Sequence, residues 1–158
     1  MSLVNLTELS GSPLFEGLAA KEIEYLGSIF TAKQIAEGKT VFVENMPGES
    51  LYLIQQGTVK ISQMLAEVDE VDLMTLTSGD VFGEMAVIDG GNRQVRARIS
   101  ENATLFILHR SRFNTLVSEH PRLGLQLTLN IVRLFSARIR RAKKDYRAML
   151  TVSLARKR

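Results

Sequence analysis

Residues 79–95 read GDVFGEMAVIDGGNRQV and carry the strongest signal in the chain. It combines the end of a strand, a glycine turn, one short apolar turn of helix and an arginine. Gly83 has no Cβ, so its backbone N–H can be approached closely. Glu84 follows at once with a carboxylate that accepts hydrogen bonds from hydroxyl groups. Arg93, ten residues after Gly83, offers a planar fork of donors that suits a phosphate.

These three groups together favour a sugar phosphate as the ligand. The carboxylate would take a ribose hydroxyl, while the arginine and nearby backbone amides would take the phosphate. The same residues also fit an ordinary turn with no ligand, because Gly-Asp and Gly-Gly pairs are common in turns and a lone arginine is usually solvated. The local pattern by itself leaves both interpretations open.

The cassette also resembles a known family. Residues 82–87 (FGEMAV), with Arg93 behind them, resemble the phosphate-binding cassette of cyclic-nucleotide-binding domains, which occur in the catabolite activator protein and in the regulatory subunit of protein kinase A. The resemblance covers about residues 13–145. It extends to three earlier segments, 38–42 (GKTVF), 47–54 (PGESLYLI) and 56–61 (QGTVKI).

The resemblance implies a mainly β domain with flanking helices. Its core would be an eight-stranded β-roll of jelly-roll type, with N-terminal helices before it and a long C-terminal helix after it. Short alternating segments punctuated by Gly and Pro agree with this. They predict separate strands that include 51–54, 58–65, 95–99 and 105–108. We expect one domain, with the roll and N-terminal helices in 1–120 and the long helix and basic tail in 121–158.

The spacing of apolar residues along the sequence predicts two helices. Apolar residues at helical intervals predict an amphipathic helix over 20–30. A long helix starts at Pro121 and runs to about Leu150. One face of it carries Leu123, Leu127, Ile131 and Leu134. A helix of that length cannot bury its whole stripe on a small roll, so we expect a homodimer through it, as the family's C-terminal helix often forms. The alternative is that the helix folds back along its own roll.

The resemblance also implies a ligand site. Gly83 would supply a backbone N–H near the phosphate, Glu84 would accept the ribose 2′-hydroxyl, and Arg93 would bind the phosphate. An Arg93→Ala variant would then lose ligand and keep its fold. The complete set of expected ligand-binding residues is Gly83, Glu84, Met85, Ala86, Arg93, Gln94, Val95 and Arg138.

Gln94 and Val95 depart from the family's pattern, and Arg138 is placed by counting along the sequence without gaps. Gln94 and Val95 stand where the family usually has two small residues, typically Ala or Ser. Arg138 and Ile139 fall where the catabolite activator has hydroxyl residues facing adenine. An arginine can stack on a purine as a cation on a π face, and this is the hypothesis for Arg138. A solvated arginine is the alternative. The ligand would be cAMP or cGMP, with no further cofactor and no metal.

Composition excludes several other classes of protein. The chain has 158 residues, no cysteine and no apolar run long enough to cross a membrane, and its N-terminus lacks the pattern of a signal peptide. We therefore expect a cytoplasmic protein without a membrane partner. Only two histidines occur, His109 and His120, and neither a serine elbow nor a Walker-type loop appears. We expect no enzymatic activity.

The charge is divided unevenly along the chain. Residues 1–132 hold 10 Lys/Arg and 16 Asp/Glu, for a net charge of −6, while residues 133–158 hold 10 Lys/Arg and one Asp, for +9. Such a basic segment suits an acidic partner, a nucleic acid or a membrane surface, or it is simply a solvated helix face. Residues 156–158 (RKR) would touch phosphates weakly and without specificity.

The expected function is a cyclic-nucleotide sensor that couples ligand binding to movement of the C-terminal helix. Eight residues follow Leu150, which leaves no room for a helix-turn-helix, so we expect no DNA binding from this chain alone. Two alternatives stay open. The chain is a degenerate fold used as an interaction module, or it is the effector domain of a truncated Crp/Fnr-type transcription regulator.

Overall fold

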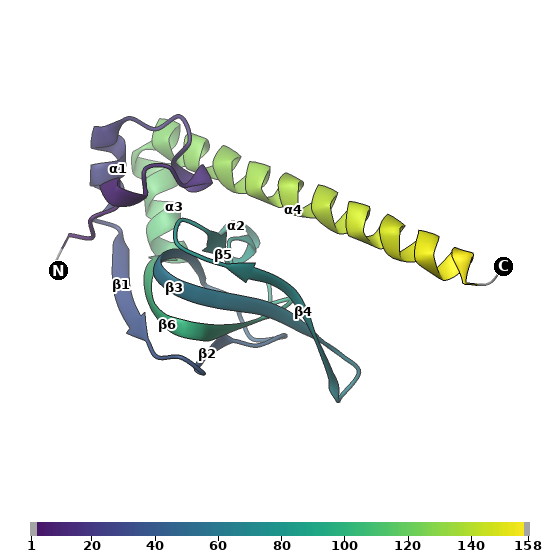
Figure 1. Ribbon diagram of the computed structural model, residues 1–158. Helices are drawn as coiled ribbons and strands as arrows, with labels where there is room; N and C mark the ends of the chain where they lie inside the picture. The colour runs from purple at the N-terminus through teal and green to yellow at the C-terminus, as the bar shows by residue number, and fades with distance from the viewer. Residues whose placement is uncertain (1–2, 157–158) are drawn as a thin grey trace.

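The computed structural model describes residues 3–156 and shows a β-roll beside two groups of helices (Figure 1). The prediction of a mainly β fold with N-terminal helices and a long C-terminal helix is confirmed. The elements follow in the order η1 (Thr7–Leu9), η2 (Pro13–Phe15), α1 (Ala20–Leu26), β1 (Phe30–Ile35), β2 (Thr40–Phe42), β3 (Ser50–Leu65), β4 (Asp69–Leu76), β5 (Val81–Phe82), α2 (Met85–Asp89), β6 (Arg96–His109), α3 (Arg110–Glu119) and α4 (Pro121–Ala155).

Two long strands, β3 and β6, form the centre of the sheet. Within the described residues the sheet has six antiparallel strands in the order β1-β6-β3-β4, with β2 added to β6 and β5 added to β3. The segments 51–54 and 58–65, predicted as separate strands, both lie in β3, and 105–108 continues the strand begun near 95–99. The eight expected strand segments are therefore six continuous strands, two of which bend.

The bend in β3 has a local cause at Gly57. Its φ of 91° lies in the left-handed region, and the register with β6 shifts on both sides of it. A Cβ at this position would lie 2.3 Å from the carbonyl oxygen of Asn102. Glycine is therefore required where the strand turns from one side of the roll to the other.

The predicted helix over 20–30 is wrong in its last third. Helix α1 ends at Leu26, and Phe30 opens strand β1. Gly27 ends the helix in close contact with the N-terminal segment, because a Cβ there would lie 2.2 Å from the carbonyl oxygen of Val4. The apolar residues at 29 and 30 fit either a helix or a strand by spacing, and tertiary packing selects the strand.

Two apolar clusters stabilise the domain. The first lies between the sheet and the helices, and residues such as Phe15, Leu53 and Phe113 belong to it. The second fills the interior of the roll around Phe82 and Ile99. Burial of apolar surface in both clusters is the main favourable term in folding such a domain.

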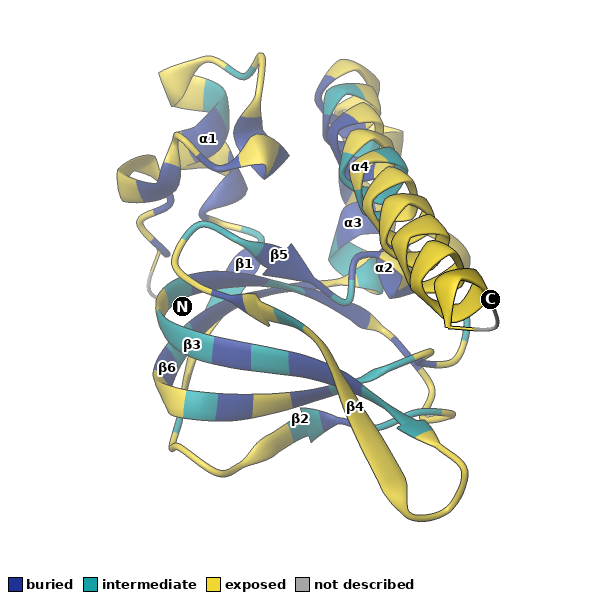
Figure 2. Cartoon of the chain, turned by 45° about the vertical axis from the view of Figure 1, so that its right-hand side comes forward, coloured by how far each residue is buried: buried dark blue, intermediate teal, exposed yellow. Residues whose placement is uncertain are grey.

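Helix α4 has two parts with different surroundings (Figure 2). Its first part contributes Leu123, Leu127 and Ile131 to the first cluster, so these residues cannot contact a partner chain. The predicted use of this stripe in a dimer is therefore wrong, and the alternative of folding back on the roll holds for this part. The second part extends away from the roll to Ala155, five residues past the predicted end, and is largely exposed.

Asn130 fixes the first part of α4 to the N-terminal segment. Its side chain is buried, and Nδ2 donates to the carbonyl oxygens of Leu14 at 2.8 Å and Glu16 at 2.9 Å. Both carbonyls belong to the turn around η2, in which Ser12 is the N-cap and Pro13 the first helical residue. This contact sets where α4 leaves the roll, and with it the position of the residues one and two turns further on.

We expect Asn130→Ala to lower the free energy of unfolding by about 1–3 kcal/mol, because it leaves buried carbonyl groups without their donor. Urea unfolding followed by circular dichroism measures this. The matched control is Asn114→Ala on the exposed side of α3, which should change stability by less than about 0.5 kcal/mol. Equal effects of the two substitutions would contradict the anchoring role of Asn130.

Candidate ligand-binding site

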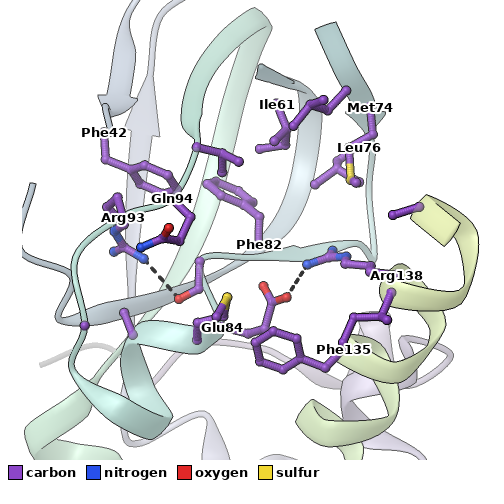
Figure 3. A pocket seen from close by; sticks show the side chains of 18 of the residues that line it. Phe42, Ile61, Met74, Leu76, Phe82, Glu84, Arg93, Gln94, Phe135 and Arg138 are labelled. Atoms are coloured by element: carbon purple, nitrogen blue, oxygen red, sulfur yellow. Dashed lines mark hydrogen bonds and ion pairs between the residues drawn. The ribbon is translucent and has the colours of Figure 1, made fainter. Parts of the chain in front are cut away.

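A cavity of about 500 Å³ opens between the roll, helix α2 and helix α4 (Figure 3). All of the residues expected from the sequence to form a ligand site line this one cavity. They are Gly83, Glu84, Met85, Ala86, Arg93, Gln94, Val95 and Arg138. The first seven come from the predicted cassette, and Arg138 reaches the cavity from α4, as Figure 3 shows.

The turn from β5 into α2 places the first of these residues. Gly83 has a φ of 70°, and a Cβ there would lie 2.7 Å from Nη1 of Arg93, so the position favours glycine on both counts. Glu84 is the N-cap residue of α2, and Ala86 is buried beneath it. Helix α2 ends at Gly90 in the left-handed conformation, as the Gly-Gly pair predicts.

Glu84 is a buried carboxylate at the edge of the cavity. Only 4% of its surface is exposed. Its Oε1 accepts a hydrogen bond from Nη1 of Arg138, while Nη2 of Arg138 donates to the carbonyl oxygen of Val81. The dashed line at the right of Figure 3 marks the ion pair. Arg138 therefore engages the predicted ribose-binding carboxylate, whereas the hypothesis from the sequence is a stacking contact with a purine.

Arg93 is buried beneath the cassette with 7% of its surface exposed. Nη1 donates to the carbonyl oxygen of Gly83 at 3.1 Å, and Nη2 donates to that of Ser50 at 2.9 Å. The guanidinium carbon lies 4.1 Å from the ring centroid of Phe42, within the range of a cation–π interaction. Among the described residues, Nε is buried without a hydrogen-bond partner.

The position of Arg93 has two consequences. Burial lowers its pKa, although Tyr52 and Glu84 nearby act in the opposite direction, and a guanidinium stays protonated in proteins. Because two of its nitrogens bond to backbone carbonyls, truncation would also leave those carbonyls without donors. The expectation that Arg93→Ala keeps the fold intact is therefore unsafe, and a smaller change is needed to test the site.

Gln94 and Val95 occupy the positions where the family usually has small residues. The Gln94 side chain is exposed, and its Nε2 donates to the carbonyl oxygen of Asn92 at 3.1 Å. This bond holds the amide on its own loop. Val95 packs against the second apolar cluster. Figure 3 shows Gln94 at the same end of the cavity as Arg93, and Arg138 at the other end.

The remaining walls are apolar, and of these residues the sequence places only Ile139 near the ligand, beside Arg138. Phe42 carries no local signal for a ligand, and Phe135 follows directly after Leu134 of the predicted helical stripe. The apolar wall consists of Phe42, Ile61, Leu73, Met74, Leu76, Phe82, Phe135, Ile139 and Ala142. A cavity with a broad apolar wall and a few charged groups suits a ligand with a flat apolar body and an anionic end.

Residues 3–156 include both histidines of the chain, His109 and His120. No group of three or more histidine and acidic residues in this range could hold a metal ion, and no helix in it is long and apolar enough to span a bilayer. His109 accepts or donates a hydrogen bond with Ser50 Oγ at 2.8 Å, and His120 packs edge-on against Tyr25. Of residues 156–158, which were predicted to touch phosphates, 157 and 158 lie outside the described residues.

Comparison with known proteins identifies relatives over most of the chain. The Cyclic AMP receptor protein of Thermus thermophilus is 32% identical over 134 residues, which are 85% of this chain and 60% of that protein. The crystal structure of the Thermus thermophilus catabolite activator protein matches with a TM-score of 0.78 and 30% identity, covering 87% of this chain and 63% of that one. This chain thus spans less than two thirds of these relatives.

A third relative is an enzyme. Glutaminase 1 of Bradyrhizobium diazoefficiens is 32% identical over 133 residues, which are 84% of this chain and 21% of that protein. The similarity is thus confined to a small part of that enzyme. The family described as cyclic nucleotide-binding domain matches residues 32–120, which include β2 to β6 and the whole cassette. The chain belongs to the cyclic nucleotide-binding domain family.

Proposed function

We propose that this domain binds a purine 3′,5′-cyclic mononucleotide, cAMP or cGMP, and acts as a regulatory sensor without catalysis of its own. One observation carries the proposal. A single cavity brings together the cassette carboxylate, the buried arginine and a broad apolar wall, in a chain that belongs to the cyclic nucleotide-binding domain family. The name of the Thermus relative, Cyclic AMP receptor protein, supports the same ligand class.

The proposed pose follows from the chemistry of the two ends of the cavity. The phosphate lies at the end of Arg93 and Gln94, where Nε of Arg93 is a buried donor without a partner in the described residues. A buried donor of this kind gains a charge-assisted hydrogen bond from a phosphate oxygen. The ribose hydroxyl lies against Glu84. The base packs on apolar residues such as Met74 and Phe135.

Helix α4 is the element through which the signal leaves the site. Phe135, Arg138 and Ile139 line the cavity, so a ligand contacts α4 directly. A ligand that favours one position of α4 over another shifts that equilibrium by its difference in binding free energy, commonly about 1–3 kcal/mol. We propose that this shift is the output of the domain. The absence of cysteine is compatible with action in the cytoplasm.

We propose further that the exposed part of α4 forms a homodimer. Apolar residues on it recur every seven positions at Leu125, Val132, Ile139 and Tyr146, and all four are exposed. A seven-residue apolar repeat is the pattern of helices that pack against each other in a coiled coil. This stripe is distinct from the buried stripe of Leu127 and Ile131, which packs on the roll of its own chain.

Thermal unfolding with cAMP, cGMP, a cyclic dinucleotide and buffer alone tests the ligand. At a hundredfold excess over its dissociation constant, a ligand stabilises the folded state by about 2.7 kcal/mol, which raises the melting temperature by several degrees. We expect this shift with at least one cyclic mononucleotide and none with the dinucleotide. No shift with either mononucleotide would overturn the proposed ligand.

The substitution Arg93→Lys tests whether Arg93 belongs to the ligand site. The lysine keeps the positive charge but loses the planar fork, so we expect binding to weaken by at least tenfold in isothermal titration calorimetry. The melting temperature without ligand should also fall, because the bonds to Gly83 and Ser50 are lost. Arg98→Lys on β6, outside the cavity, is the matched control. Unchanged affinity in folded Arg93→Lys would remove Arg93 from the site.

The homodimer is tested by replacing two residues of the exposed stripe that do not line the cavity. Val132→Lys with Tyr146→Lys places charge in an apolar interface, so we expect the mass in solution to fall from that of two chains to the 17.6 kDa of one. Light scattering after gel filtration measures it. Ala148→Lys with Thr151→Lys, on the opposite face, adds the same charge and should leave the dimer intact. A monomeric parent protein would refute the proposal.

A further inference from the structure

The outer segment of α4, residues 140–156, is exposed along its whole length. Figure 1 shows it extending past the roll, and Figure 2 shows its surface as exposed. The segment carries six Lys/Arg and one Asp, a net charge of +5, whereas residues 1–132 carry −6. Among the described residues, none of these six cations forms an ion pair. Their charge is therefore available to an anionic partner.

Four basic residues form a row along one side of the helix, which we call the basic row. They are Arg133, Arg140, Lys144 and Arg147. Their separations of 7, 4 and 3 positions return each of them to the same side of an α-helix. At 1.5 Å per residue the row is about 21 Å long. Ala142, which lines the cavity, is two positions from both Arg140 and Lys144, so the row faces away from the cavity.

The helix then ends in an exposed apolar segment, which we call the apolar end. It consists of Met149, Leu150, Val152 and Leu154, of which Leu150 is the least exposed at 41% and Leu154 the most at 66%. Val152 and Leu154 are two positions apart, so they point to nearly opposite sides of the helix. A second helix packed along one stripe cannot cover both, whereas an interfacial layer of lipid contacts several sides of a helix end at once.

Nucleic acids and anionic lipid surfaces both present phosphate groups to a row of cations. The side chains around the row do not suit a nucleic acid. Residues 131–156 contain no Asn or Gln, which read adenine edges. Phe135 and Tyr146 are each two positions from a member of the row and lie on other sides of the helix, where they cannot stack on bases that the row holds. A nucleic acid would also leave the apolar end in water.

We propose that the outer segment of α4 binds the surface of an anionic lipid membrane. The basic row contacts headgroup phosphates, and the apolar end enters the interfacial layer. The helix lies on the surface and does not cross it, since no helix within residues 3–156 is long and apolar enough to span a bilayer. The expectation of no membrane partner rests on the lack of a spanning run, and surface binding needs none.

Co-sedimentation with vesicles tests the proposal on the full chain without nucleotide. The vesicles are phosphatidylcholine alone, or phosphatidylcholine and phosphatidylglycerol mixed at about two to one. We expect the parent protein to bind the mixed vesicles at least about tenfold more tightly than the neutral ones, and added salt to weaken that binding. No binding to the mixed vesicles, or equal binding to both kinds, would overturn the proposal.

Two variants separate the basic row from the apolar end. The charge variant combines Arg140→Gln, Lys144→Gln and Arg147→Gln, and we expect its partition into mixed vesicles to fall at least about tenfold. The apolar variant combines Met149→Gln and Leu154→Gln, and we expect a similar fall because less apolar surface enters the lipid. Glutamine supports a helix, and circular dichroism checks that the helical content is kept. Unchanged partition of the apolar variant would refute insertion of the helix end.

The matched control removes the same charge from other exposed positions. It combines Lys21→Gln, Lys33→Gln and Lys39→Gln, which lie on the N-terminal helices and the roll. Both triple variants lower the net charge of the protein equally, so a difference between them reports on the location of the charge. We expect the control to bind mixed vesicles as the parent does. An equal loss in the two triple variants would overturn the assignment to α4.

A labelled DNA duplex tests the competing partner at the same salt concentration. Fluorescence anisotropy measures its binding to the parent protein. We expect weak binding that disappears as the salt concentration rises, because contacts to phosphate alone release counterions and depend steeply on salt. Tighter binding to the duplex than to the mixed vesicles would assign the basic row to a nucleic acid and overturn the lipid proposal.

Discussion

The structure around the site depends on the burial of one cation, Arg93. A guanidinium removed from water must have its donors satisfied, or it strongly destabilises the fold. The carbonyls of Gly83 and Ser50 satisfy two of its nitrogens, and the face of Phe42 covers its plane. Because Gly83 lies in the cassette and Ser50 opens β3, the same cation fixes the cassette against the sheet. The position of the cassette therefore depends on this one side chain.

The second constraint is the unequal attachment of α4. Its first part is held by the apolar cluster and by the two hydrogen bonds of Asn130 to the N-terminal segment. Its second part contacts the domain through few side chains, of which Arg138 makes the polar contacts with Glu84 and Val81. A helix held firmly at one end and by a few contacts beyond it can change position without loss of the core. This geometry suits a sensor.

The sequence predicts the cassette well because its signals are local: Gly83, Glu84 and Arg93 lie within eleven residues and line one cavity. It predicts strand segments because polar and apolar residues alternate in stretches such as 94–99, but it does not predict that these segments join into longer strands. The bend at Gly57 depends on contact with Asn102 across the sheet. Helical spacing shows that α4 has apolar faces without showing which face the roll covers. The partner of Arg138 lies 54 residues away in the chain, and no local pattern contains it.

The ionisable side chains around the cavity set the net charge that a ligand meets. Its ionisable lining side chains within the described residues are Glu84, Arg93 and Arg138. Since Arg138 and Glu84 pair with each other, the charge that a ligand meets is the single positive charge of Arg93. A cyclic phosphodiester carries one negative charge, whereas a phosphate monoester carries about 1.5 to 2 at neutral pH. The second charge of a monoester would be buried without a partner, which is costly. The net charge of the cavity thus suits a phosphodiester with one negative charge better than a phosphate monoester.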